Sequence, residues 1–173
     1  MLVGMMGAGK SAVGRLLAER LARPFVDADD ALQAKLARTI PQVFAEDGED
    51  RFRREESGVL IDLLDQRPAA VVAAGGGVVV RDANREVLRE RATVVWLQAP
   101  IGELVRRVGS GSGRPLLSGD PVGALTELEA ARSPLYAEVA GLVLDTADRD
   151  PALLAEELAA ALGPAVRTSG RSS

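Results

Sequence analysis

The sequence contains no cysteine and no histidine. Without cysteine, the chain can form neither disulfide bonds nor metal sites with thiolate ligands. Without histidine it has no imidazole, which is the usual proton carrier near neutral pH and the commonest metal ligand. Any acid–base chemistry therefore has to use carboxylates, lysine, tyrosine or water.

Lysines, aromatic residues and long apolar runs are also scarce, and Lys10 and Lys35 are the only lysines. No apolar stretch approaches the roughly 20 residues that span a bilayer. The first residues do not form the basic segment and apolar run of a signal peptide. The net charge of −4 is opposite in sign to the basic surface expected of a nucleic-acid-binding protein. We therefore expect a cytoplasmic monomer with no membrane or nucleic-acid partner.

The 173 residues, 47% of them hydrophobic, suffice for one domain with its own core. Short apolar runs, expected to be strands, alternate with longer segments of helical periodicity. Strands are predicted at residues 2–3, 24–26, 70–74, 93–97 and 142–144. Helices are predicted at residues 11–21, 29–37, 41–45, 49–64, 82–91, 101–108, 122–132 and 151–162. This alternation is typical of an α/β, doubly wound fold, here one domain over residues 1–162 followed by a disordered tail at 163–173.

Each predicted strand leads directly into a chemically unusual segment. These segments are residues 4–11, 27–30, 75–77, 109–119 and 145–151. In parallel sheets, ligands bind beyond the carboxyl ends of the strands. The five segments are therefore expected to meet at one edge of the sheet and to form a single active site.

Residues 4–11 fit the phosphate-loop pattern G-x-x-x-x-G-K-[ST] in full. In such a loop, backbone N–H groups face a polyphosphate, while the lysine reaches its β- and γ-phosphates and the hydroxyl binds Mg²⁺. A chance match in a glycine-rich turn is the alternative, but a strand before and a helix after are both predicted here. We therefore expect ATP and Mg²⁺ to bind this loop. Its residues are Gly4, Met5, Met6, Gly7, Ala8, Gly9, Lys10 and Ser11.

The rest of the sequence narrows the class of phosphate-loop protein. A GTPase would need a base-reading [NT]-K-x-D segment, and the sequence has none. A motor or transport ATPase usually has an apolar strand that ends in a metal-binding aspartate. The strand at residues 69–74 runs into three glycines instead. These differences favour a small-molecule kinase.

Asp27 and Asp29 follow the second predicted strand. Two apart in an extended segment, they would share a face, so that Asp27 could hold Mg²⁺ and Asp29 could accept a hydrogen bond from the acceptor hydroxyl. The alternative is that Asp29 and Asp30 only cap a helix. Beside a phosphate loop, the functional interpretation is favoured.

Arg53 and Glu56 are three residues apart on a predicted helix and therefore neighbours on one face. The commoner explanation for such a charged run is a solvated surface. The sharper hypothesis is that Arg53 binds a substrate carboxylate through two hydrogen bonds while Glu56 orients its guanidinium. Arg132 is a second candidate for the same carboxylate.

Two glycine-rich segments complete the site predicted from sequence. Gly75, Gly76 and Gly77 end a buried strand, where a ligand could approach bare backbone, although a sharp turn is the alternative. Residues 109–121 combine glycine and serine with Arg114. They could form a mobile lid that brings positive charge to the transferred phosphoryl group. A disordered linker is the alternative.

Together these motifs resemble the shikimate kinase family. They are GxxGxGKS at residues 4–11, Phe-x-Asp-x-Asp at 25–29, Phe-Arg-Arg-x-Glu at 52–56, GGG at 75–77, Arg-Pro-Leu at 114–116 and Arg-x-Pro-Leu-Tyr at 132–136. The resemblance implies a three-layer phosphate-loop kinase fold with a five-stranded parallel sheet in the order 2-3-1-4-5. It also implies transfer of the γ-phosphoryl group of ATP to the 3-hydroxyl of shikimate, with Mg²⁺ as cofactor.

The resemblance also implies roles for individual residues. Asp29 would contact the reacting hydroxyl, and Arg53, Arg132 and a glycine of residues 75–77 would bind the substrate carboxylate. Asp27 would serve the magnesium site, and Arg114 would be the lid arginine. The adenine would be held by Arg107 and by the segment from Asp145 to Pro151.

Ala74 stands where many members of the family have threonine, and the lid segment is unusually rich in glycine and serine, but no catalytic group is missing. Two other functions remain open from the sequence. One is a sister kinase for gluconate or another sugar acid. The other is a nucleotide-binding module without catalysis. The intact set of Asp29, Arg53 and Arg132 argues against the second.

Overall fold

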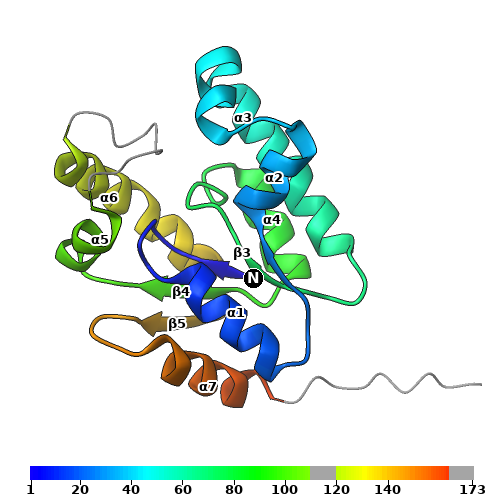
Figure 1. The fold of residues 1–173 in the computed structure, drawn as a ribbon, viewed down its shortest axis with the longest axis vertical. Helices are drawn as coiled ribbons and strands as arrows, with labels where there is room; N and C mark the ends of the chain where they lie inside the picture. The colour runs from blue at the N-terminus through cyan, green and yellow to red at the C-terminus, as the bar shows by residue number, and fades with distance from the viewer. Residues whose placement is uncertain (110–119, 164–173) are drawn as a thin grey trace, which may run out of the picture.

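Five short parallel strands form the centre of the computed structural model, which describes residues 1–109 and 120–163 (Figure 1). They are β1 (Leu2–Val3), β2 (Phe25–Asp27), β3 (Val71–Ala73), β4 (Val95–Gln98) and β5 (Leu142–Asp145). Their order across the sheet is β2-β3-β1-β4-β5. This order confirms the one that the family resemblance implied, and it places the carboxyl ends of all five strands at one edge.

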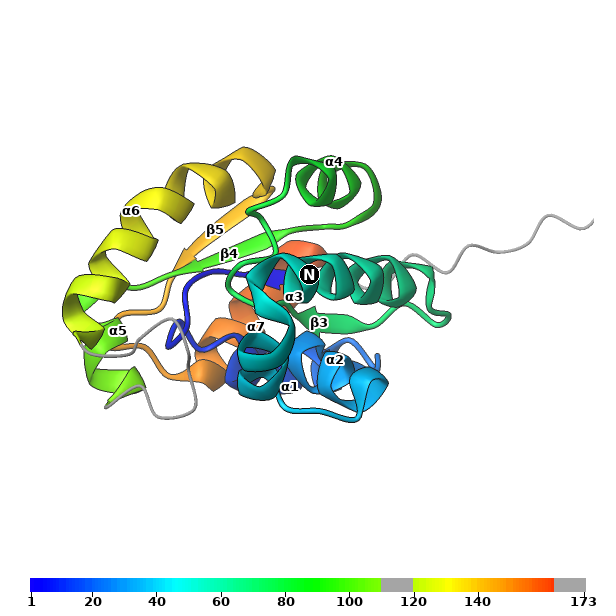
Figure 2. The same cartoon turned by 90° about the horizontal axis from the view of Figure 1, so that it is seen from above.

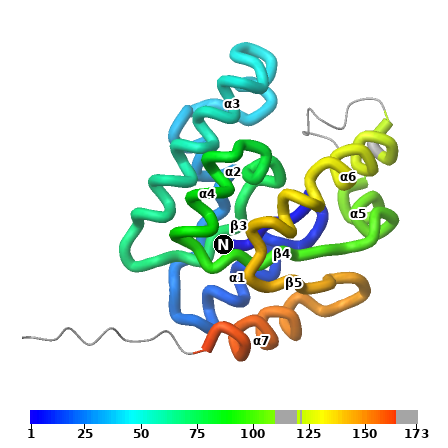
Figure 3. Tube along the Cα trace, turned by 180° about the vertical axis from the view of Figure 1, so that it is seen from behind, coloured from blue at the N-terminus to red at the C-terminus, as the bar shows by residue number. Residues whose placement is uncertain are grey.

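Helices cover both faces of this sheet. They are α1 (Lys10–Arg20), α2 (Ala28–Leu36), α3 (Ile40–Asp65), α4 (Asp82–Arg91), α5 (Ile101–Val108), α6 (Pro121–Val139) and α7 (Pro151–Leu162). On one face α1 packs against α7, and on the other α4 lies between α3 and α6 (Figures 2 and 3). The three-layer α/β fold predicted from the sequence is confirmed. Among the described residues, no helix combines the length and apolar character needed to cross a membrane.

The central strands are buried on both sides. Leu2 and Val3 in β1, and Val95 and Leu97 in β4, are at most 1% exposed. Parallel strands covered by helices on both faces are expected to be apolar throughout rather than alternating. Burial of these side chains fixes the sheet, and with it the position of the loops at its carboxyl edge.

The two helices predicted at residues 41–45 and 49–64 together form α3, and non-helical backbone at Gly48, with φ 78°, separates them by a kink. Another helix prediction was wrong. Helix α6 was expected to end at Arg132 but continues to Val139, although Pro134 lies inside it. Proline removes one helical hydrogen bond, but the helix beyond it buries Tyr136 and Val139 in the core. Most of the predicted lid and tail, residues 110–119 and 164–173, lies outside the described residues.

Candidate functional site

The phosphate loop joins β1 to α1 at the carboxyl edge of the sheet (Figure 1). Gly4 opens it with φ 138°, and a β-carbon there would clash with the carbonyl oxygen of Leu97 on the neighbouring strand. Any larger residue would therefore push the loop away from β4. The Nζ of Lys10 donates to the carbonyl oxygens of Gly4 and Met5, both at 2.9 Å. The lysine thus lies across its own loop, within reach of the position that a polyphosphate would occupy.

Ser11, the last residue of the phosphate loop, contacts Asp27 at the end of β2. The Ser11 hydroxyl donates to Oδ2 of Asp27 at 2.6 Å. The other oxygen of Asp27 accepts from the backbone N–H of Asp29 and so caps α2. The sequence had suggested Asp29 and Asp30 as the capping residues, and it had placed Asp27 and Asp29 on one extended segment. Both suggestions are wrong, because Asp27 ends β2 while Asp29 already lies in the first turn of α2.

Asp29 projects from that first turn into the cleft that Lys10 also lines. Burial raises the pKa of the Asp29 carboxyl above its usual range, and the negative charge of Asp27 raises it further. Lys10 and Arg53 act in the opposite direction. The result is a carboxyl group that is more basic than an exposed aspartate and lies on the same side of the sheet as the phosphate loop.

Arg53 and Glu56 are both buried, at 6% exposure, so the solvated-surface alternative does not apply to them. Nη1 of Arg53 donates to Glu56 at 2.8 Å, and Nη2 donates to Glu49 at 2.9 Å. Arg132, 5% exposed, lines the same cleft. Burial lowers the pKa of Arg132, and the positive charge of Arg53 contributes in the same direction. Two buried guanidinium groups that repel each other form a site suited to a carboxylate.

The three consecutive glycines give room to these side chains. A β-carbon at Gly75 would lie 2.8 Å from Oδ1 of Asp29 and 2.8 Å from Oε1 of Glu56, and one at Gly77 would overlap the Arg53 guanidinium. Real β-carbons essentially never come that close to other atoms. From the sequence, close approach of a ligand to the bare backbone was one explanation of these glycines. The structure gives another reason for Gly75 and Gly77, because side chains of the site itself occupy the space.

Most of these groups line one cleft of about 610 Å³. The predicted site residues that line it are Met6, Gly7, Gly9, Lys10, Ser11, Asp27, Asp29, Arg53, Glu56, Gly75, Gly76, Gly77, Arg107 and Arg132. Three predicted loop residues, Gly4, Met5 and Ala8, are buried and do not line it. Arg114 lies outside the described residues. Phe44 and Phe52 also line the cleft, with ring centroids 4.6 Å apart.

Gln33 and Ile40 also line the cleft and were not identified from the sequence. Gln33 lies on α2, and its side-chain oxygen accepts from the backbone N–H of Ile40. An isolated glutamine and isoleucine carry no motif. Only the antiparallel approach of α2 and the start of α3 brings them to the cleft.

Arg107 on α5 connects the phosphate loop to the segment after β5. It donates to the carbonyl oxygen of Gly7 at 3.3 Å and to the hydroxyl and carbonyl oxygens of Thr146 at 3.1 and 2.8 Å. Thr146 is buried and belongs to the segment from Asp145 to Pro151 that the resemblance assigned to the adenine. Asp145 is exposed, and Pro151 lies in the first turn of α7. Neither of these two lines the cleft.

A single cleft lined by a phosphate loop, a carboxylate and two buried arginines defines a phosphate-loop kinase of small molecules. The comparisons with known proteins agree. A family model described as "Shikimate kinase" matches residues 6–163. A shikimate kinase of Symbiobacterium thermophilum is 52% identical over 80% of this chain and 81% of its own length. One of Bordetella pertussis is 46% identical over 91% of this chain and 74% of its own.

The solved structures lead to the same result. A shikimate kinase from Acinetobacter baumannii in complex with shikimate has a TM-score of 0.90 and 40% sequence identity, covering 93% of this chain and 90% of its own. A gluconokinase from Sinorhizobium meliloti has a TM-score of 0.62 at 23% identity, which shows the shared fold alone. The chain belongs to the shikimate kinase family.

Proposed function

We infer that this protein transfers the γ-phosphoryl group of ATP to the 3-hydroxyl of shikimate. The observation that carries this inference is that Lys10, Asp29 and the two buried arginines line one cleft. Shikimate offers a carboxylate and, across its ring, hydroxyl groups. The paired guanidinium groups of the cleft match the carboxylate, and the carboxyl group of Asp29 matches a hydroxyl group that accepts the phosphoryl group from the phosphate loop.

On the nucleotide side, we propose that the backbone N–H groups of residues 4–11 hold the phosphates. Lys10 would exchange its bonds to two loop carbonyls for bonds to the β- and γ-phosphates. Arg107, which already joins Gly7 to Thr146, would lie beside the adenine together with residues 145–151. Arg114, placed in the lid by the sequence, would add positive charge at the transferred group.

Ser11 and Asp27 are the residues that would hold Mg²⁺. Both present oxygen atoms, the ligands that Mg²⁺ prefers, and their hydrogen bond at 2.6 Å supports a site in which one ion contacts both. Among the described residues there is no cluster of three or more carboxylates that could hold a metal by itself. That agrees with Mg²⁺, which commonly binds through one or two protein ligands and the phosphates of the substrate. When bound, Mg²⁺ neutralises phosphate charge.

On the acceptor side, Arg53 and Arg132 would bind the carboxylate, and Glu56 would keep Arg53 in place. Asp29 would then position the hydroxyl for in-line attack on the terminal phosphorus. The high pKa of Asp29 favours a strong hydrogen bond from that hydroxyl. Phosphoryl transfer depends mainly on such positioning and on charge neutralisation. We further propose that the enzyme is monomeric and cytoplasmic.

The test is ADP release in a coupled assay, with shikimate and gluconate as alternative acceptors. We expect shikimate-dependent ADP release and little with gluconate. Faster release with gluconate would make the protein a sugar-acid kinase instead. ATP binding with no acceptor-dependent ADP would indicate a non-catalytic module. Phosphorus NMR of the product would then establish which hydroxyl carries the phosphate.

A further inference from the structure

Residues Val78 to Val80 follow the three glycines and form a turn that leads into α4. Two backbone bonds close the turn, from Val78 N–H to Gly75 and from Val80 N–H to Gly77. The Val78 and Val79 side chains are buried in the core. The two backbone bonds use the carbonyl groups of Gly75 and Gly77 as acceptors. The carbonyl groups of Val78, Val79 and Val80 therefore need other donors.

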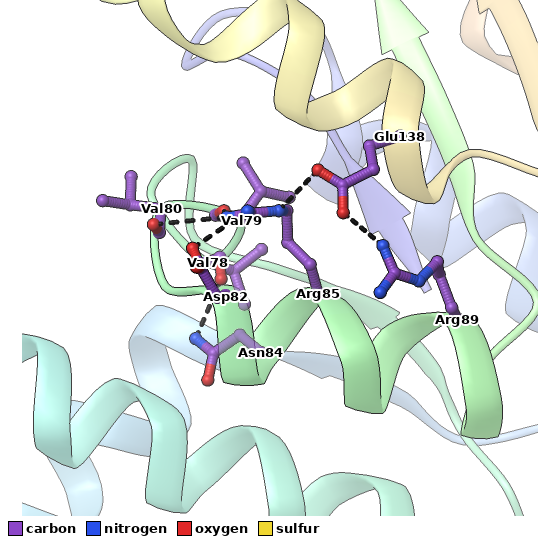
Figure 4. Close-up of polar contacts among 8 residues, drawn as sticks. All are labelled: Val78, Val79, Val80, Asp82, Asn84, Arg85, Arg89 and Glu138. Atoms are coloured by element: carbon purple, nitrogen blue, oxygen red, sulfur yellow. Dashed lines mark hydrogen bonds and ion pairs between the residues drawn. The ribbon is translucent and has the colours of Figure 1, made fainter.

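Two neighbouring residues at the start of α4 supply these donors (Figure 4). Nδ2 of Asn84, which is 3% exposed, donates to the carbonyl oxygen of Val78 at 2.8 Å. Nη1 of Arg85 donates to the carbonyl oxygen of Val79 at 2.9 Å and to that of Val80 at 3.4 Å. The backbone that follows the glycines is therefore held by side chains from the next helix.

Arg85 also reaches a third element. Its Nε donates to Oε2 of Glu138 on α6 at 2.7 Å, and its Nη2 donates to Asp82 at 2.9 Å (Figure 4). All three guanidinium nitrogens are thus engaged, and the side chain is only 13% exposed. A cation in the first turns of a helix is electrostatically unfavourable. Arg85 is stabilised there by acceptors from the glycine loop, from α4 and from α6.

Helix α6 carries Arg132, which belongs to the acceptor side of the cleft. It contacts the glycine loop directly where the Tyr136 hydroxyl donates to the Gly76 carbonyl, and indirectly where Glu138 binds Arg85 of α4. Arg132 lies one helical turn before Tyr136, and its Nη1 would be 3.6 Å from a β-carbon at Gly76. Arg53, on α3, lies against Gly77 of the same loop. The loop is therefore the common support of both guanidinium groups.

We propose that Asn84 and Arg85 are positioning residues that set the distance between Arg132 and Arg53, and thereby the affinity for the carboxylate of the acceptor. Neither residue lines the cleft, so they act through the loop and through α6. The proposal rests on the proposed function, since it concerns the acceptor side of that same site. Loss of the hydrogen bonds made by Asn84 and Arg85 lets α6 move relative to the glycine loop. This movement weakens binding of the acceptor carboxylate but leaves the phosphate loop unchanged.

Helix α4 offers a matched set of three arginine-to-alanine variants. Arg85 binds both the loop and Glu138, Arg89 binds Glu138 only (Figure 4), and Arg91 binds Asp65 on α3. For Arg85→Ala we expect the KM for shikimate to rise about tenfold, within the range that a small misplacement produces. Its KM for ATP should stay within about twofold. Arg89→Ala and Arg91→Ala should leave both constants near those of the wild type.

Conservative variants separate positioning from stability. Arg85→Lys keeps the charge but cannot span the loop carbonyls and Glu138 together, so it should give an intermediate KM for shikimate. Asn84→Ala should act in the same direction as Arg85→Ala. Melting temperatures are measured in parallel, and kinetics are run well below them. If Arg85→Ala does not fold, Arg85→Lys and Asn84→Ala carry the test.

The proposal is overturned if Arg85→Ala and Asn84→Ala melt earlier but retain the KM for shikimate of the Arg91→Ala control. It is also overturned if their KM values for ATP and shikimate rise together, because a general loosening would explain that. Failure of the proposed function looks different. In that case the wild-type protein itself releases no ADP with shikimate, whatever happens at Arg85.

Discussion

Gly77 and Arg53 are packed so closely that a β-carbon on the glycine would overlap the arginine's guanidinium group. Arg53 cannot retreat easily, because Glu49 and Glu56 hold it from the other side. In Gly77→Ala we therefore expect a displaced guanidinium and a KM for shikimate that rises about tenfold or more, with the KM for ATP little changed. Steady-state kinetics with each substrate varied in turn would measure this.

A matched glycine provides the control. Gly102 lies on α5, where a β-carbon would meet no atom within 4 Å. Gly102→Ala should leave both KM values unchanged and stabilise the helix by about 0.5–1 kcal/mol. If Gly77→Ala bound shikimate as the wild type does, the close contact with Arg53 would have no functional role.

Asp29 and Lys10 should be needed for turnover itself. We expect Asp29→Ala and Lys10→Met each to lower kcat by about 10²-fold or more, because one removes the group that positions the hydroxyl and the other a charge on the phosphates. Asp29→Ala should still bind ATP. Asp30 is exposed in the same turn of α2, so Asp30→Ala is the control and should keep full activity. Full activity in Asp29→Ala would remove Asp29 from the mechanism.

Much of this site could be predicted from the sequence because its signals are local. The phosphate loop is a contiguous pattern, and the glycine run stands out because three glycines cannot be explained by a strand. The capping of α2 by Asp27 is a local contact between residues two apart, but aspartates at 27, 29 and 30 are equally good capping residues, so the sequence alone did not single out Asp27. The length of α6 could not be predicted, since burial of Tyr136 and Val139 in the core overrides the local preference of Pro134. The links from Arg85 to Glu138 and from Arg107 to Gly7 join residues 53 and 100 positions apart, and no motif announces them.

Arg53 and Arg132 should determine the affinity for the acid. Arg53→Ala and Arg132→Ala are each expected to raise the KM for shikimate about 10- to 100-fold, the usual effect of losing a charge-assisted hydrogen bond. The KM for ATP should change little. Arg54, the exposed neighbour of Arg53, is the control, and Arg54→Ala should behave as the wild type. Equal effects on both substrates would show that the arginines support the fold rather than bind the carboxylate.

The raised pKa of Asp29 has a consequence for stability that can be measured without substrate. Because folding raises this pKa, the folded protein binds the proton more tightly than the unfolded chain. The corresponding stability is full below the unfolded pKa and is lost as the pH rises through the folded one. At neutral pH, well above the unfolded pKa, Asp29 therefore destabilises the fold relative to low pH, since burial and Asp27 oppose its charge more than Lys10 and Arg53 support it.

Asp29→Asn removes that charge and keeps the shape of the side chain. At about pH 7.5 the variant should unfold at a higher temperature than the wild type, although it has lost activity. The difference should shrink as the pH falls to about 4 and below, where the carboxyl becomes protonated in the unfolded as well as the folded state. Thermal melts of Asp29→Asn, Asp30→Asn and the wild type across this pH range would measure the difference in melting temperature. Asp30→Asn, an equivalent change at an exposed carboxylate, should show no such pH-dependent gain. A stabilisation of Asp29→Asn that is the same at every pH would mean that the charge of Asp29 is not its cause.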